Sequence, residues 1–151
     1  MKSYVIEPLS GIRGCVRFGM SREEVRSLLA PASPDPFSRG STEIDGFFDA
    51  TLQVSYNQQA KVEFIEFARS GRSRVVFEEL DLFGSEASAV IERLKRKYDL
   101  DPDEAEPEYS YCFPRIELGL WRPVVPKSPT DEEGRFFESV GFGCTGYYSR
   151  R

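Results

Sequence analysis

Apolar residues follow helical spacing in some segments of the chain and the two-residue alternation of strands in others. The order of these segments predicts the order of the helices and strands. Val25 and Leu29 follow helical spacing, and Ser21 with Glu24 form an S-x-x-E capping box at the start of that stretch. Pro31 follows, and a proline ring blocks the continuation of a helix. The sequence therefore predicts a first helix between Ser21 and Pro31.

A second helical stripe predicts a helix from about Ser85 to Tyr98. Its apolar positions are Ala87, Val90, Ile91, Leu94 and Tyr98. Lys95, Arg96 and Lys97 fall in its last turn, where positive charge suits the negative end of the helix dipole.

Period-two alternation and aromatic runs predict the strands, at residues 4–6, 47–48, 52–56, 62–67, 75–77, 109–113, 116–121 and 136–142. Residues 31–46 are rich in proline, glycine and serine, and we expect them to form a long loop. Strands that follow one another through short turns are expected to pair antiparallel.

A weak internal repeat suggests how these elements are grouped. Residues 18–25 begin with a Phe-Gly pair and carry a valine seven positions after the phenylalanine, and residues 83–90 do the same. We expect one domain over residues 1–151, with pseudo-repeats at about 12–80 and 81–148. The predicted fold class is α+β, with two helix-then-β-hairpin units that form an antiparallel sheet and pack their helices on one face.

Residues 19–29, GMSREEVRSLL, resemble the helix motif of the beta-lactamase-inhibitor-protein-like fold, which a small lipoprotein of the outer-membrane assembly machinery shares. The resemblance implies a tandem of helix-and-sheet units that grips another protein with a sheet face. No signal peptide, lipid-attachment cysteine or disulfide-spaced cysteine pair of that family is evident in these residues, so we expect neither a secreted inhibitor nor a membrane-anchored assembly factor. In size and acidity it is also similar to bacterial toxin immunity proteins, although no motif supports this.

Composition excludes several mechanisms and suggests a compartment. The chain has no histidine, which removes Ser-His-Asp and Cys-His nucleophilic machinery and imidazole-based zinc sites. Its three cysteines have no C-x-x-C spacing, and neither a signal peptide nor an apolar run long enough to span a membrane is evident. We therefore expect a cytoplasmic protein with reduced thiols and no contact with a membrane.

The net charge of −5 bears on the choice of partner. Residues 99–108 carry six carboxylates and no cation. An acidic surface repels phosphate backbones, so we expect no nucleic-acid partner and favour a basic protein. Asp99, Asp101 and Asp103 match the first EF-hand spacings, but Glu104 stands where that loop needs glycine, so we expect no metal and no cofactor.

Aromatic residues and an arginine near the acidic segment form the candidate binding site. Tyrosine, tryptophan and arginine dominate interface hot spots because they bury a large area at low entropic cost. The predicted partner-binding residues are Tyr109, Tyr111, Trp121, Arg122, Tyr147, Tyr148, Asp101, Asp103 and Glu104. Tyr111 and Trp121 could instead belong to the core.

These observations favour a non-catalytic protein-binding module, of the kind an immunity or inhibitor protein represents, which masks the active site of its partner. A small-molecule-binding domain, or a histidine-free enzyme with a sheet pocket, is the second reading. A structural subunit of a homodimer is the third. The sequence leaves open whether the chain is a monomer or a homodimer.

Overall fold

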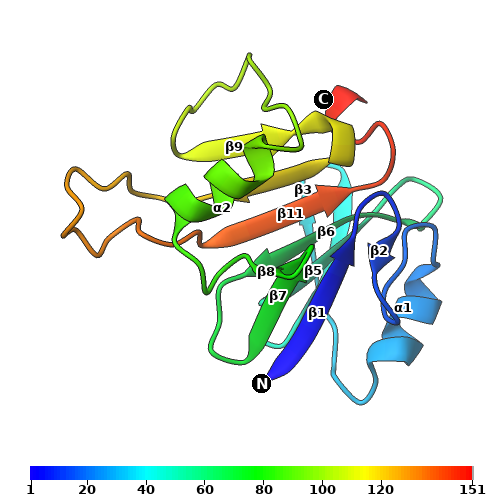
Figure 1. Cartoon of the computed structure of the whole chain (residues 1–151). Coiled ribbons are helices and arrows are strands. Elements are labelled where there is room, and N and C mark those ends of the chain that lie inside the picture. Colours follow the sequence, from blue (N-terminus) through cyan, green and yellow to red (C-terminus); the bar gives the residue numbers. More distant parts are fainter. Residues whose placement is uncertain (151) are drawn as a thin grey trace.

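The protein is built mainly from two β-sheets, as a computed structural model that describes residues 1–150 shows (Figure 1). The larger sheet has seven strands in the order β3-β4-β5-β6-β11-β10-β9, and all of its pairings are antiparallel. The smaller sheet has four strands in the order β2-β1-β7-β8. Within it, β1 and β7 pair in parallel, with Tyr4 opposite Val75.

The strands of the larger sheet are β3 (Asp35–Arg39), β4 (Thr42–Phe47), β5 (Leu52–Tyr56), β6 (Val62–Ala68), β9 (Ser110–Phe113), β10 (Leu118–Trp121) and β11 (Ser139–Gly143). Those of the smaller sheet are β1 (Lys2–Glu7), β2 (Gly11–Ile12), β7 (Ser73–Phe77) and β8 (Leu80–Asp81). The helices are α1 (Arg22–Leu29) and α2 (Ala87–Lys95), with short 3-10 turns η1 (Pro114–Ile116) and η2 (Tyr148–Arg150).

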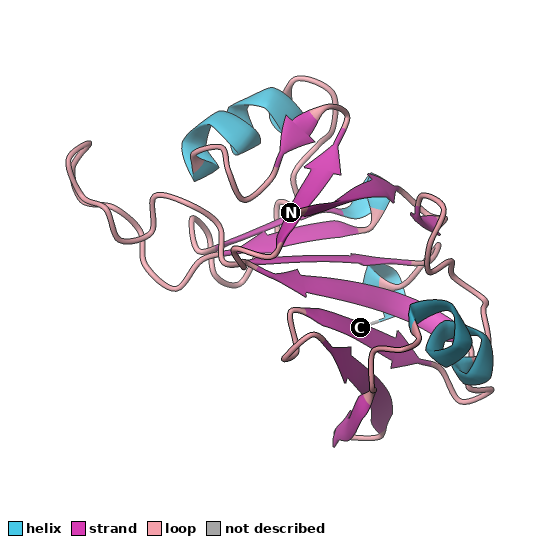
Figure 2. Ribbon diagram, turned by 90° about the horizontal axis from the view of Figure 1, so that it is seen from below, coloured by secondary structure: helices cyan, strands magenta, loops and turns pink. Residues whose placement is uncertain are grey.

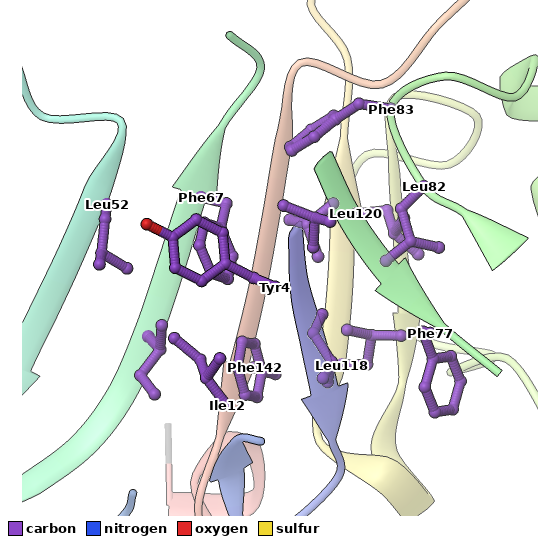
Figure 3. Packing of buried hydrophobic residues seen from close by; sticks show 14 of the residues in the cluster. Tyr4, Ile12, Leu52, Phe67, Phe77, Leu82, Phe83, Leu118, Leu120 and Phe142 are labelled. Carbon is purple, nitrogen blue, oxygen red and sulfur yellow. The ribbon is translucent and has the colours of Figure 1, made fainter. Parts of the chain in front are cut away.

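The core lies between the two sheets (Figure 3). Tyr4 of β1 packs against Phe67 of β6 with 5.1 Å between ring centroids, and Phe67 in turn stacks near Phe142 of β11 at 6.4 Å. Leu118 and Leu120 of β10 point into the same layer. The face of the seven-stranded sheet that is turned away from the four-stranded sheet is called the outer face below.

The first helix begins as predicted. Ser21 accepts a hydrogen bond from the Glu24 amide at 3.1 Å, and Glu24 accepts one from the Ser21 amide at 3.2 Å, which completes the capping box. The second helix is also confirmed, although it is shorter than predicted. Figures 1 and 2 show that α1 and α2 lie at opposite ends of the molecule, and no helix among the described residues is long and apolar enough to cross a membrane.

The predicted α+β class with two helix-then-hairpin units is wrong. The fold is mainly β, and the layer that covers the larger sheet is itself a sheet rather than a pair of helices. Both halves of the chain contribute strands to one shared sheet, where β6 and β11 meet at its middle. The helix starts share a local pattern, but the chain that follows each of them forms different structure.

The loop predicted at 31–46 is also wrong, because residues 35–47 form the β3–β4 hairpin. Proline and glycine suggested a break, yet both suit this hairpin. Pro36 lies on β3, an edge strand, where a missing N–H is tolerated. Gly40, in the turn, has a φ of 61°, a conformation that glycine adopts without steric cost.

Candidate binding site on the outer sheet face

Two glycines that face each other across neighbouring strands form a hollow in the outer face. Gly119 of β10 pairs with Gly141 of β11, and Glu66 of β6 and Cys112 of β9 continue the same row on either side. Because neither glycine has a side chain, the sheet surface is lowered between its neighbours. The resulting hollow has a volume of about 180 Å³. We call it the glycine hollow.

Aromatic side chains pack closely around these glycines. A Cβ atom on Gly119 would lie 2.6 Å from the Tyr148 hydroxyl, and one on Gly141 would lie 2.4 Å from Cζ of Phe64. Phe64 also stacks on Tyr147, with 4.5 Å between ring centroids. The glycines are therefore required by the close approach of the rings, and the rings give the hollow a fixed aromatic wall.

Glu117 holds the C-terminal turn that supplies two of these rings. This residue lies between η1 and β10 with a φ of 52°, and it is buried. Its carboxylate accepts hydrogen bonds from the amides of Gly146 at 3.0 Å and Tyr148 at 2.9 Å. Its carbonyl accepts one from the Gly143 amide at 2.9 Å. The buried charge is therefore compensated by backbone donors, and it fixes the turn against the sheet.

The charged groups that line the glycine hollow are all acidic. They are Glu66 and Glu104, and among the residues that the structure describes no lysine or arginine lines it. Glu66 Oε2 accepts a hydrogen bond from Ser139 Oγ at 3.1 Å, which orients the carboxylate on the sheet. Burial raises the pKa of the Tyr148 hydroxyl, and the nearby thiol and acidic groups raise it further. The phenol is therefore neutral at physiological pH.

Cys112 lies at one side of the hollow and is unsuited to nucleophilic chemistry. Burial raises the pKa of its thiol to about 11, and the negative charges of Asp101, Glu104 and Glu117 add to this effect. Because only the thiolate is nucleophilic, the thiol is inert at neutral pH.

The structure brings together three of the nine predicted binding residues on the outer face, because Trp121, Tyr148 and Glu104 line the glycine hollow. Tyr111 also borders the hollow, but it pairs with Leu120 and its ring packs against Phe137 on the core side of the sheet. Trp121 is the last residue of β10, and its side chain is 41% exposed. Tyr147 is buried beneath the same site, where it stacks on Phe64.

The remaining four residues lie elsewhere. Arg122 follows the end of β10, is buried and does not line the hollow, because its guanidinium donates to the Glu108 and Gly134 carbonyls. Tyr109 is exposed just before β9. Asp101 and Asp103 belong to the connector along the edge of β9, where the Asp101 amide donates to the Cys112 carbonyl at 2.8 Å and Asp101 Oδ1 accepts from the Asp103 amide at 2.9 Å.

Four residues that shape the site were not among the predicted binding residues, namely Gly119, Gly141, Glu66 and Glu117; the two glutamates were considered only as strand carboxylates that could converge on a sheet face. Glycine is rare in the interior of a strand and often marks a close approach by another group. Two glycines in predicted strands were therefore a usable signal. The role of Glu117 had no such signal, since its partners lie about 30 residues further along the chain.

A second charged cluster joins α1 to the larger sheet. Asp45 of β4 is fully buried, and it accepts hydrogen bonds from Arg22 and Arg26 and from the Tyr56 hydroxyl at 3.0 Å. Burial alone would raise the pKa of Asp45, but the donors outweigh it and hold the pKa at about 2. Every acceptor oxygen of this carboxylate is engaged, so the cluster serves stability rather than binding.

No group of three or more acidic, cysteine or histidine side chains within residues 1–150 has the arrangement of a metal site. Comparison of the chain with protein-family models, with characterised proteins and with solved structures gives no match. The resemblance of residues 19–29 to the beta-lactamase-inhibitor-protein-like fold therefore stays a prediction.

Proposed function

We propose that the protein is a non-catalytic binding module, which holds another protein by taking one basic side chain of that partner into the glycine hollow. The observation that carries this proposal is the lining of the hollow, which combines aromatic rings with two carboxylates and, within the described part of the chain, contains no cation. The immunity or inhibitor role suggested by size and acidity has no support from the fold, and it is not part of the proposal.

The size of the hollow favours a side chain over a free ligand. Pockets for drug-sized small molecules usually measure about 300–1,000 Å³. The hollow, at about 180 Å³, is below that range and suits one long side chain. It also lies on the rigid centre of a sheet, between hydrogen-bonded strands, so it requires little ordering when a partner binds.

The chemistry favours arginine over lysine. A planar guanidinium can stack on the Trp121 or Tyr148 ring while its N–H groups pair with the Glu66 carboxylate. A cation over an aromatic ring gains about 0.5–1 kcal/mol when exposed and about 2 kcal/mol when desolvated. Hydrogen bonds to an ionised group add about 1.5–3 kcal/mol each.

A peptide array tests the proposal. Peptides that differ only at a central arginine, lysine, glutamine or glutamate are probed with the wild-type protein and with the Trp121→Ala variant. We expect retention in the order arginine, lysine, then glutamine, and loss of this preference in the variant. Equal retention of arginine and glutamine peptides would contradict the proposal.

A further inference from the structure

Arg122 is a buried cation without an acidic partner. Its side chain is 8% exposed, and no carboxylate among the described residues lies within ion-pair distance. Its Nε donates to the Glu108 carbonyl at 2.8 Å and its Nη1 to the Gly134 carbonyl at 2.9 Å. Its guanidinium also lies 6.0 Å from the Tyr111 ring centroid and 5.9 Å from that of Phe137. A buried charge is costly unless a counter-charge accompanies it, and here the protein supplies two carbonyl dipoles and two aromatic rings but no ion pair.

Two cavities meet at this arginine. One, of about 400 Å³, runs along α2 and is lined by Ile91, Tyr111 and Lys95 among others. The other, of about 490 Å³, opens beside the loop that extends from the body between β10 and β11 (orange in Figure 1), and Lys127 lines it. Arg122 and Ser88 line both cavities. The first cavity is mainly apolar where Ile91 and Tyr111 contribute, and the second is more polar.

The walls of the two cavities carry five cations and four carboxylates, an excess of one positive charge. Arg96 is paired with Glu92 at 3.3 Å, and Arg135 is paired with Glu86 at 3.1 Å and with Glu132 at 2.8 Å. Asp131 is engaged by the amides of Lys127 at 2.8 Å and Ser128 at 3.2 Å.

Three cations in the cavity walls, Arg122, Lys95 and Lys127, belong to none of these ion pairs. The wall carboxylates that also lie outside the pairs are those of Glu108 and Asp131. The chain as a whole has a net charge of −5, so this local excess of positive charge runs against its composition.

The start of α2 adds to the positive potential at the same place. This helix has nine residues and begins at Ala87, and its N-cap Glu86 makes no side-chain capping bond but pairs with Arg135. The Ala87 amide donates to the Arg135 carbonyl at 2.8 Å, and Ser88 is the second residue of the helix. The N-terminal end of a helix carries partial positive charge and favours an anion. Ser88, in the first turn of this helix, and Arg122 line the same two cavities from two different elements.

We propose that this double cavity binds a small organic anion. Its carboxylate lies against Arg122 and the start of α2, and its apolar part lies along Ile91 and Tyr111. Tyr111 borders both this site and the glycine hollow, and the site assigns the protein a second ligand of a different class. The anion would also fix the loop after β10, because Arg122 already holds the Gly134 carbonyl of that loop.

Nuclear magnetic resonance of the ¹⁵N-labelled protein tests this proposal with hexanoate as the probe. Hexanol is the neutral control of matched length, and inorganic phosphate is the control that lacks an apolar part. We expect hexanoate to shift the Ser88 amide and the Arg122 Nε–H signals with saturation, hexanol to leave both unchanged, and phosphate to bind more weakly than hexanoate.

Variants separate binding from folding. Arg122→Met is expected to weaken hexanoate binding about tenfold or more, since it removes a charged donor. If that variant fails to fold, the combined Lys95→Glu and Lys127→Glu variant changes only exposed side chains and is expected to weaken binding about two- to fivefold. Lys61→Glu, an exposed change outside both cavities, is the matched control and should have no effect.

Equal responses to hexanoate and hexanol would overturn the proposal, because the cavity would then recognise only the apolar chain. Phosphate binding as tight as that of hexanoate would overturn the apolar half of the assignment. Unchanged hexanoate affinity in the double-charge variant, together with an unmoved Arg122 signal, would overturn it entirely.

Discussion

Glu117 and Tyr148 are joined by a hydrogen bond of 2.9 Å from the Tyr148 amide to Glu117 Oε2, although 31 residues separate them in the sequence. The other carboxylate oxygen of Glu117 takes the Gly146 amide at 3.0 Å. These two bonds fix the last turn of the chain against the sheet. Through them, one buried acidic residue positions the aromatic wall of the glycine hollow.

The Glu117→Gln variant should lower the free energy of unfolding by about 1–3 kcal/mol, because an amide nitrogen cannot accept the backbone donor that a carboxylate oxygen accepts. Urea unfolding measures this change. Glu138→Gln is the matched control, since the Glu138 side chain is 45% exposed and its pairing with Arg69 is long, at 3.4 Å. Equal stability of the two variants would show that the hydrogen bonds from the C-terminal turn to the Glu117 carboxylate contribute nothing to stability.

The Gly141→Ala variant should lose about 1–3 kcal/mol of stability through overpacking. The added Cβ would lie 2.4 Å from Cζ of Phe64, and this ring is itself packed against Tyr147 and Tyr148. Gly71→Ala is the control, because a Cβ there meets nothing within 4 Å. Thermal unfolding of both variants should show a lower melting temperature for Gly141→Ala alone, and a similar loss at Gly71 would contradict the packing described.

The Asp45 cluster should make stability depend on acid pH. The pKa of Asp45 is about 2 in the folded protein, against about 3.9 for an unperturbed aspartate. A depressed folded pKa means that the contribution is complete above about pH 5 and is lost as the pH falls toward 2. Wild-type stability should therefore fall by about 1 kcal/mol from this group alone between pH 7 and pH 3.

The Asp45→Asn variant tests the assignment of that pH dependence. It should cost about 3–5 kcal/mol at pH 7, because Arg22 and Arg26 lose their buried partner. Its deficit relative to the wild type should shrink as the pH falls. A deficit that stays constant from pH 7 to pH 3, measured by urea unfolding, would assign the dependence to other groups.

Cys112 should resist alkylation in the folded state. With a pKa of about 11, its thiolate fraction at pH 8 is about one in a thousand, whereas an unperturbed cysteine of pKa about 8.5 is about one quarter ionised. Iodoacetamide labelling followed by mass spectrometry should show slow modification of Cys112 at pH 8 and fast modification in urea. Equally fast labelling in both conditions would contradict the conclusion that burial suppresses the Cys112 thiolate in the folded protein.

Local features of the fold were predictable from the sequence, and long-range ones were not. The capping box at Ser21 and Glu24 and the stripe from Ala87 to Leu94 lie within single helices, so spacing alone identified them. The parallel pairing of β1 with β7 joins residues 71 positions apart, such as Tyr4 and Val75, and no local pattern encodes it. Without that second sheet, the helices appeared to be the only available covering layer.

The residue types of the candidate site were likewise predictable from the sequence, and their arrangement in space was not. Trp121, Tyr148 and Glu104 were identified by residue type alone, because aromatic and acidic side chains suit a binding surface. The hollow itself depends on the register that places Gly119 opposite Gly141, and register is a property of the assembled sheet. Arg122 was predicted with Trp121 because arginine and tryptophan are both common in interface hot spots, yet Arg122 follows the end of β10 and is buried, with its guanidinium on the Glu108 and Gly134 carbonyls.

Fluorescence of Trp121, which is the only tryptophan of the chain, tests the proposed recognition of a basic side chain most directly. The protein is titrated with a short peptide that contains one arginine, and with the same peptide carrying citrulline, its neutral isostere. The account predicts a saturable change in emission with the arginine peptide, a weaker response in the Glu66→Gln variant, and none with citrulline. An equal response to both peptides, or no response to either, would contradict it.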